Sequence, residues 1–192
     1  MKYINNFLKH KIIITQSLTF IPFILLFCLH FTSCGSETPE KVFSIAVLNS
    51  NALAGFANNG MLRQIESPSE KLVEGSSETV PMKSREIVNS KIEFAETNLK
   101  KVNDLKITDD TKEMILASQA LYEFVIPVYK TEYIQLAEFY DTGAPKDKID
   151  IISESIHNKY SSRYEELYKN LINTGKKYAE KHNIKVNWGT DQ

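Results

Sequence analysis

The sequence contains few of the residues that define several common protein classes. It has two cysteines, Cys28 and Cys34, and four histidines among 192 residues. A small secreted protein held by disulfides would show an even set of cysteines at useful spacings, whereas Cys28 lies inside the apolar leader described below and its removal would leave Cys34 alone. With so few cysteines and histidines, the chain also offers few residues from which a Ser/His/Asp or Cys/His catalytic group could be built. We therefore expect a hydrophobic core to stabilise the protein, and we predict no catalytic, cofactor-binding or metal-binding residue.

Basic blocks, glycine-rich loops and strand-like alternation are also missing. The chain has 23 lysines and arginines against 24 aspartates and glutamates, so its formal net charge is −1. A protein without a basic block is a poor candidate for nucleic-acid binding. The absence of a glycine-rich loop argues against a phosphate-binding loop, and the lack of alternating segments argues against a β fold.

The first 34 residues differ in composition from the rest. Residues 1–11 carry three lysines and no acid, residues 12–31 are mostly apolar, and small residues follow. These are the three parts of a bacterial export signal. The strongly apolar centre, residues 18–31, is about 14 residues long, whereas a spanning helix needs about 20. A cleaved signal peptide is therefore favoured over a permanent anchor.

The end of this leader carries a resemblance to a known class. Phe31-Thr32-Ser33-Cys34 is similar to the lipobox of bacterial lipoproteins, with Phe31 where leucine is usual, as Bacteroidota leaders tolerate. The resemblance implies cleavage after Ser33, diacylglycerol on the Cys34 sulfur, and a fatty acid such as palmitate on the new amino terminus. Gly35 is not the aspartate that retains some lipoproteins in the inner membrane, so the outer membrane is the preferred location.

On this interpretation the chain has four parts. These are a signal peptide (1–33), a flexible tether (34–40), a helical domain (41–183) and a loose C-terminal tail (184–192). The mature part of 159 residues is about one domain, and its net charge is −4 because the leader removes three lysines and no acid. Two or three acyl chains would hold it on the membrane. A secreted protein with a chance cysteine and an uncleaved membrane anchor are the alternatives.

Apolar residues recur at helical intervals through most of the mature part. The pattern predicts helices at about 40–65, 80–105, 109–143 and 145–182, with a turn signal at 58–60 that weakens the first. Asp109 and Asp110 are expected to cap the third helix, and Pro127 to kink it. Residues 66–79 are predicted to be an exposed loop and a candidate contact surface. Short connections imply antiparallel neighbours, so we predict an all-α, four-helix up-and-down bundle.

This arrangement, with Tyr-Ala-Glu-Lys-His-Asn-Ile at 178–184, resembles an uncharacterised family of helical surface lipoproteins from spirochaetes and Bacteroidota. The resemblance covers residues 83–186, about two thirds of the mature chain. It implies an envelope location, and it supplies no activity or functional residues.

Two histidines of the mature part need an interpretation. Glu154 and His157 are three residues apart on one helix face, the spacing that di-iron bundles use for a carboxylate and an imidazole. A second copy is missing because residues 80–142 contain no histidine, so a solvated face is favoured over a metal site. His182 follows Lys181 near a helix end, where a cation complements the carbonyl dipoles, so a capping role is favoured over catalysis.

Tyrosines are concentrated in the last two predicted helices. Eight of the nine lie there: Tyr122, Tyr129, Tyr133, Tyr140, Tyr160, Tyr164, Tyr168 and Tyr178. Their spacings place many on shared faces, which favours an aromatic seam between the two helices with the hydroxyls reaching the surface. A partner or ligand surface is the alternative, because tyrosine is enriched at interfaces.

Two classes of function stay open. The favoured one is a non-enzymatic, lipid-anchored envelope protein that binds another protein or an envelope component through a helix face or residues 66–79. The alternative is a small-molecule or metal-binding bundle, with or without enzymatic activity. That alternative requires a concave pocket lined by convergent polar groups.

Overall fold

Helices make up most of the protein in the computed structural model, which describes residues 37–188. The predicted signal peptide and Cys34 lie outside the described residues. In chain order the elements are α3 (Pro39–Ala46), the 3-10 helix η2 (Leu48–Leu53), α4 (Asn59–Glu66), β1 (Glu70–Leu72), β2 (Thr79–Pro81), α5 (Ser84–Asn103), α6 (Lys112–Val128), the π-helical turn η3 (Tyr129–Tyr133), α7 (Ile134–Asp141) and α8 (Lys146–Lys181). The predicted all-α class is confirmed.

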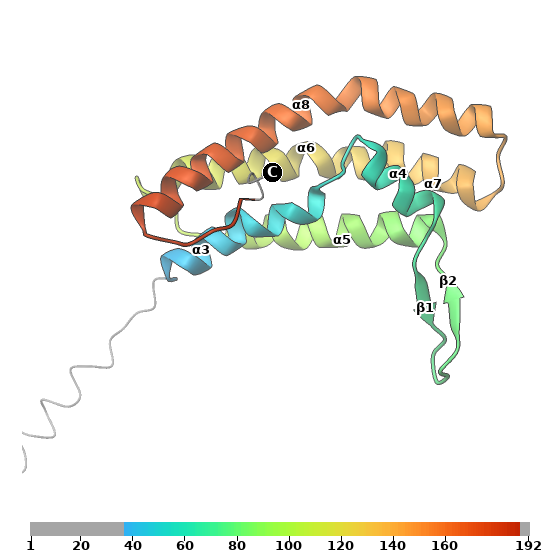
Figure 1. Cartoon of the computed structure of the whole chain (residues 1–192), viewed down its shortest axis with the longest axis horizontal. Coiled ribbons are helices and arrows are strands. Elements are labelled where there is room, and N and C mark those ends of the chain that lie inside the picture. Colours follow the sequence, from blue (N-terminus) through green and yellow to red (C-terminus); the bar gives the residue numbers. More distant parts are fainter. Residues whose placement is uncertain (1–36, 189–192) are drawn as a thin grey trace, which may run out of the picture. The chain divides into compact units, whose positions relative to one another are not determined.

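We number the helical arms in chain order: α3, η2 and α4 form the first, α5 the second, α6, η3 and α7 the third, and α8 the fourth. The second, third and fourth arms are long and lie side by side (Figure 1). The arm formed by α6, η3 and α7 packs against α5 on one side and α8 on the other. The segments α3, η2 and α4 run along these arms, with α3 in contact with α5, α6 and α8. Residues 40–65, predicted as a single helix, are therefore three short pieces.

Backbone conformation explains why this first arm is broken. Gly55 has φ 92°, in the left-handed region that interrupts a right-handed helix, and Ala57 has φ 53°. Gly55 and Gly60 also approach closely, because a Cβ built on Gly60 would lie 3.0 Å from the Cα of Gly55. The Asn58 side chain then accepts a hydrogen bond from the Gly60 N–H at 2.7 Å and caps α4. The turn signal at 58–60 thus marks a helix start.

The third arm changes its helical form just after Pro127. Proline has no N–H to donate and crowds the preceding turn, and the π-helical turn η3 begins two residues later. The Thr131 hydroxyl donates to the Pro127 carbonyl oxygen at 2.9 Å. Tyr129 and Tyr133, four residues apart across this turn, are both buried, with ring centroids 5.4 Å apart.

The segment predicted as a loop contains a β-hairpin. β1 pairs antiparallel with β2, with Lys71 opposite Val80, and Gly75 takes φ 75° in the turn between them. Residues 69–81 are all exposed, and Figure 1 shows the hairpin projecting away from the helices. Exposure was predicted correctly, whereas the absence of strands was not, because three-residue strands are too short to give an alternating pattern.

The ordered structure extends beyond the predicted helical domain, 41–183, at both ends of the described region. α3 begins at Pro39, inside the predicted tether 34–40, and the Thr38 hydroxyl caps it by accepting from the Lys41 N–H at 3.3 Å. Residues 184–188 are not helical, but Ile184, Val186 and Trp188 pack against the core. The Trp188 ring lies 5.8 Å from the Phe43 ring in an edge-on arrangement. This part of the tail is therefore not loose.

Phe56 lies at the centre of the aromatic core. Its ring is 5.0–6.0 Å from the rings of four aromatic residues on the third and fourth arms, namely Phe124, Tyr129, Tyr133 and Tyr164. The backbone around Phe56 is irregular, so its polar groups need partners from side chains. The Tyr133 hydroxyl accepts from the Ala57 N–H at 2.9 Å, and the Tyr164 hydroxyl donates to the Leu53 carbonyl at 2.8 Å.

The hydroxyls of two buried tyrosines, Tyr133 and Tyr122, should make different contributions to the free energy of unfolding. Tyr133→Phe leaves the buried Ala57 N–H without a partner, so we expect a loss of about 1–3 kcal/mol in the free energy of unfolding. The Tyr122 hydroxyl is buried without a hydrogen-bond partner in the described structure. Tyr122→Phe should therefore be neutral within about 0.5 kcal/mol, or stabilising. Urea unfolding followed by far-UV circular dichroism measures both.

Each variant serves as the matched control for the other, because both remove one oxygen from a fully buried tyrosine ring. Equal losses in the two variants would contradict the assigned role of Tyr133.

Candidate functional site

The tyrosines of the last two arms belong mainly to the core. Tyr122, Tyr129, Tyr133, Tyr164 and Tyr178 are buried, and Tyr140, Tyr160 and Tyr168 are half-buried. The predicted aromatic seam is present, and Phe56 from the first arm completes it, but the hydroxyls of Tyr122, Tyr133 and Tyr164 are buried and do not reach the surface as predicted. Burial raises the pKa of Tyr133 to about 12, so this hydroxyl stays protonated at neutral pH. The described tyrosines do not form a contiguous exposed surface.

His157 binds the irregular backbone of the first arm. Its Nδ1 lies 2.8 Å from the Ala57 carbonyl oxygen, and a carbonyl only accepts, so Nδ1 carries the hydrogen. Glu154 is exposed. Among residues 37–188, no group of three or more histidine, cysteine, aspartate or glutamate side chains is placed to hold a metal. The contact with Ala57 gives His157 a structural role.

His182 and Lys181 join the end of α8 to the start of the third arm. Nε2 of His182 lies 2.6 Å from Oδ2 of Asp110, and Nζ of Lys181 lies 2.5 Å from Oδ1. His182 is at the C-cap of α8, as its predicted capping role requires, and its ring is 4.3 Å from that of Tyr178. The expectation that Asp110 caps its own helix is wrong. The residue at that N-cap is Thr111, and Asp110 pairs across to α8.

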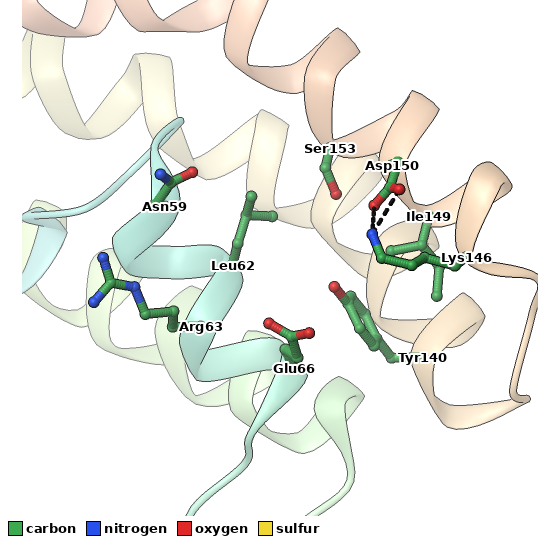
Figure 2. A pocket seen from close by; sticks show the side chains of 9 residues that line it. All are labelled: Asn59, Leu62, Arg63, Glu66, Tyr140, Lys146, Ile149, Asp150 and Ser153. Atoms are coloured by element: carbon green, nitrogen blue, oxygen red, sulfur yellow. Dashed lines mark hydrogen bonds and ion pairs between the residues drawn. The ribbon is translucent and has the colours of Figure 1, made fainter.

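A charged pocket lies between α4 and the junction of α7 with α8 (Figure 2). Its volume is about 280 Å³, and its charged side chains are Arg63, Glu66, Lys146 and Asp150. Figure 2 shows Glu66 and Tyr140 facing each other across it. Burial, followed by the charges of Glu66 and Asp150, raises the pKa of Tyr140. Lys146 contacts both Asp150 oxygens at 2.6 Å, so two acids and two bases leave no net charge to select a ligand.

A larger hollow, the Trp188 cleft, lies between η2, α8 and the C-terminal segment. Its volume is about 580 Å³, within the range of about 300–1,000 Å³ usual for small-molecule sites. Its lining includes Tyr168, Lys169, Ile172, Lys176 and Trp188. This site was not predicted, because Trp188 lies in the segment expected to be a loose tail. The spacing of Tyr168, Ile172 and Lys176 along one face of α8 was the available signal.

No family model, no curated protein and no solved structure matches this sequence. Within residues 37–188, the structure contains no helix with the length and hydrophobicity needed to cross a membrane.

The pairing of Asp110 with α8 predicts a pH dependence of stability. Lys181, followed by His182, holds the pKa of the Asp110 carboxyl below its usual value. A carboxyl whose pKa is lower in the folded than in the unfolded state stabilises the fold above the unfolded pKa of about 4, and this contribution is lost as pH falls. Asp110→Asn should therefore lower the free energy of unfolding at pH 7 and approach the native value near pH 3.

Asp109→Asn is the matched control, because Asp109 is the exposed neighbour of Asp110. Urea unfolding between pH 3 and pH 7 makes the comparison. A native-minus-variant difference that is the same at both ends of this range would refute the assignment.

Proposed function

We propose that this chain is a lipid-anchored protein of the bacterial cell envelope, with the outer membrane as its preferred location. The observation that carries the proposal is the leader, in which a basic start and an apolar run end at Ser33 and Cys34. The first helix, α3, begins at Pro39, only a few residues after Cys34. This spacing fits a short tether between acyl chains on Cys34 and a folded body.

The role proposed for this body is binding or structural support without catalysis. Its candidate chemical groups already have structural partners, since His157 contacts Ala57 and His182 contacts Asp110. Neither imidazole contacts a serine or threonine hydroxyl in the described structure, so neither is positioned to activate one as a nucleophile.

Intact-mass analysis of protein extracted from membranes tests the anchor. We expect a chain that starts at Cys34 and carries the added mass of diacylglycerol plus one fatty acid. Such a chain should stay with the membrane, because each buried methylene contributes about 0.8 kcal/mol and one acyl chain alone binds only marginally. Cys34→Ala should lack this mass, because the sulfur that would accept the lipid is gone.

Cys28→Ala is the matched control, because it removes the other thiol of the chain and leaves the proposed lipobox intact. A native chain that starts near residue 34 without added lipid would identify a secreted protein. A native chain that keeps residues 1–33 would identify an uncleaved anchor. Either result refutes lipidation.

We further propose that the hairpin of β1 and β2 contacts a protein partner. Leu72 is 69% exposed and Val80 40% exposed. The N–H of Val73 donates to the Glu78 carbonyl, and that of Met82 to the Ser69 carbonyl, both at 2.9 Å. In an antiparallel pair this alternation turns the main-chain groups of Glu70 and Leu72 outward.

The two edges of the hairpin are not equivalent. Pro81 removes a donor from the outer edge of β2, so β1 is the open edge, suited to an added strand. Glu70, Glu74 and Glu78 make the hairpin acidic, and its one lysine, Lys71, is paired with Glu86 of α5. The partner that fits is an extended segment with apolar and basic side chains.

Site-specific photo-crosslinking in intact cells tests this contact. A photoreactive residue at position 72 should give a discrete adduct with one protein, because this side chain lies beside the open edge. The matched control is position 151 on α8, where Ile151 is similarly exposed at 65%. Equal adducts from both positions, or none from position 72, would contradict the proposal.

The alternative function, small-molecule binding, is favoured by one observation, the Trp188 cleft. That cleft is concave and is lined by both apolar and polar side chains, as the alternative requires.

A further inference from the structure

Apolar and polar side chains both line the Trp188 cleft, and they are interleaved along α8. The apolar ones include Val47, Ile172, Val186 and the indole of Trp188. The C-terminal segment reaches this position by turning back at the end of α8 and running beside α3 (Figure 1). The turn is fixed by Asn183, with φ 56°, and by the Ile184 N–H, which donates to the Ala179 carbonyl at 2.8 Å. The indole therefore stands opposite a rigid helix and can contact an apolar ligand.

The charged side chains that line the cleft within the described residues are cationic. Lys169 and Lys176 lie there together with Asn51 and Asn173, and none of the lining residues between 37 and 188 is a carboxylate. Within residues 37–188 neither lysine forms an ion pair, and Lys176 Nζ lies 5.5 Å from the centre of the Trp188 ring. A lysine held over an indole keeps its charge beside the apolar side chains. The charged pocket of Figure 2 differs, because its lysine is neutralised by Asp150.

This combination defines the ligand chemistry. We propose that the Trp188 cleft binds a small organic anion with an apolar body and one carboxylate or phosphate group. The apolar body lies against Trp188 and Ile172, and the anionic group lies between Lys169 and Lys176, where ammonium groups donate charge-assisted hydrogen bonds. The side-chain amides of Asn51 and Asn173 can donate hydrogen bonds to the remaining oxygens of the anionic group. This binding goes beyond membrane anchoring and does not depend on it.

The sequence supplies a reporter for the test. Trp188 is the only tryptophan of the chain, so excitation near 295 nm observes the cleft directly. The probe is 4-phenylbutyrate, added to the full chain in a non-ionic detergent, beside 4-phenylbutanol and 4-phenylbutylamine, which share its carbon skeleton. We expect a saturable change of Trp188 fluorescence with the acid. The alcohol and the amine should bind at least about fivefold more weakly, the size of one partly exposed charge pair.

Variants separate the cleft from the rest of the surface. Lys169→Gln should weaken binding of the acid about fivefold. Lys176→Gln should do the same by equilibrium dialysis, which is used because this change alters the surroundings of the indole. Lys177→Gln is the matched control, since Lys177 pairs with Glu113 and does not line the cleft, and it should bind as the native chain does. Circular dichroism verifies that each variant is folded.

Two results would overturn the proposal. One is the absence of saturable binding of the acid by both fluorescence and dialysis, with detergent alone as the blank. The other is equal affinity for the acid, the alcohol and the amine, which would mean that the lysines do not select charge. Neither result bears on the acylation of Cys34, which the mass analysis decides separately.

Discussion

Irregular backbone around three buried residues, Leu53, Phe56 and Ala57, is the constraint around which this fold is built. Residues 53–57 lie outside a regular α-helix, and a buried polar group left unpaired there would cost about 1–3 kcal/mol. Tyr133 and Tyr164 supply hydroxyls, and His157 supplies a ring N–H. In return Phe56 enters the space between the third and fourth arms and contacts their aromatic rings. The tyrosine seam is therefore a set of hydrogen-bond partners as well as an apolar layer.

The long arms could be predicted from sequence because their signal is local. α8 runs for 36 residues, and its buried positions, such as Ile149, Ile156, Tyr164 and Leu171, follow the helical period. α5 shows the same stripe through Val88, Ala95 and Val102. In such segments the helical period alone gathers the apolar residues on one face, and a neighbouring helix covers that face. Intervals of three and four residues are then enough to locate the buried face.

The first arm could not be predicted in the same way because its conformation depends on distant residues. Its apolar side chains also fall at roughly helical intervals, yet Gly55 and Ala57 take left-handed conformations. The Ala57 N–H in this conformation is paired by the hydroxyl of Tyr133, which lies 76 residues further along the chain. Similarly, Asp110 has the sequence position of a helix cap, but its charge is satisfied by Lys181 and His182. Sequence patterns identify which groups need partners, whereas tertiary packing decides which partners they find.

The positive charge of the lysines in the Trp188 cleft is opposite in sign to the net charge of the whole domain. The mature part would carry a net charge of −4, so an anion approaching from a distance meets weak repulsion rather than attraction. Salt screens this repulsion beyond about 8 Å at physiological ionic strength. Selection of an anion must therefore come from groups in direct contact with it, which are Lys169 and Lys176.

The cleft is also lined by Val47, which directly follows α3. At about 3.5 Å per residue, the segment from Cys34 to Thr38 spans at most about 14 Å. A lipid on Cys34 would therefore hold the start of α3 close to the membrane surface, and the same first arm would carry both the anchor and part of the lining of the cleft.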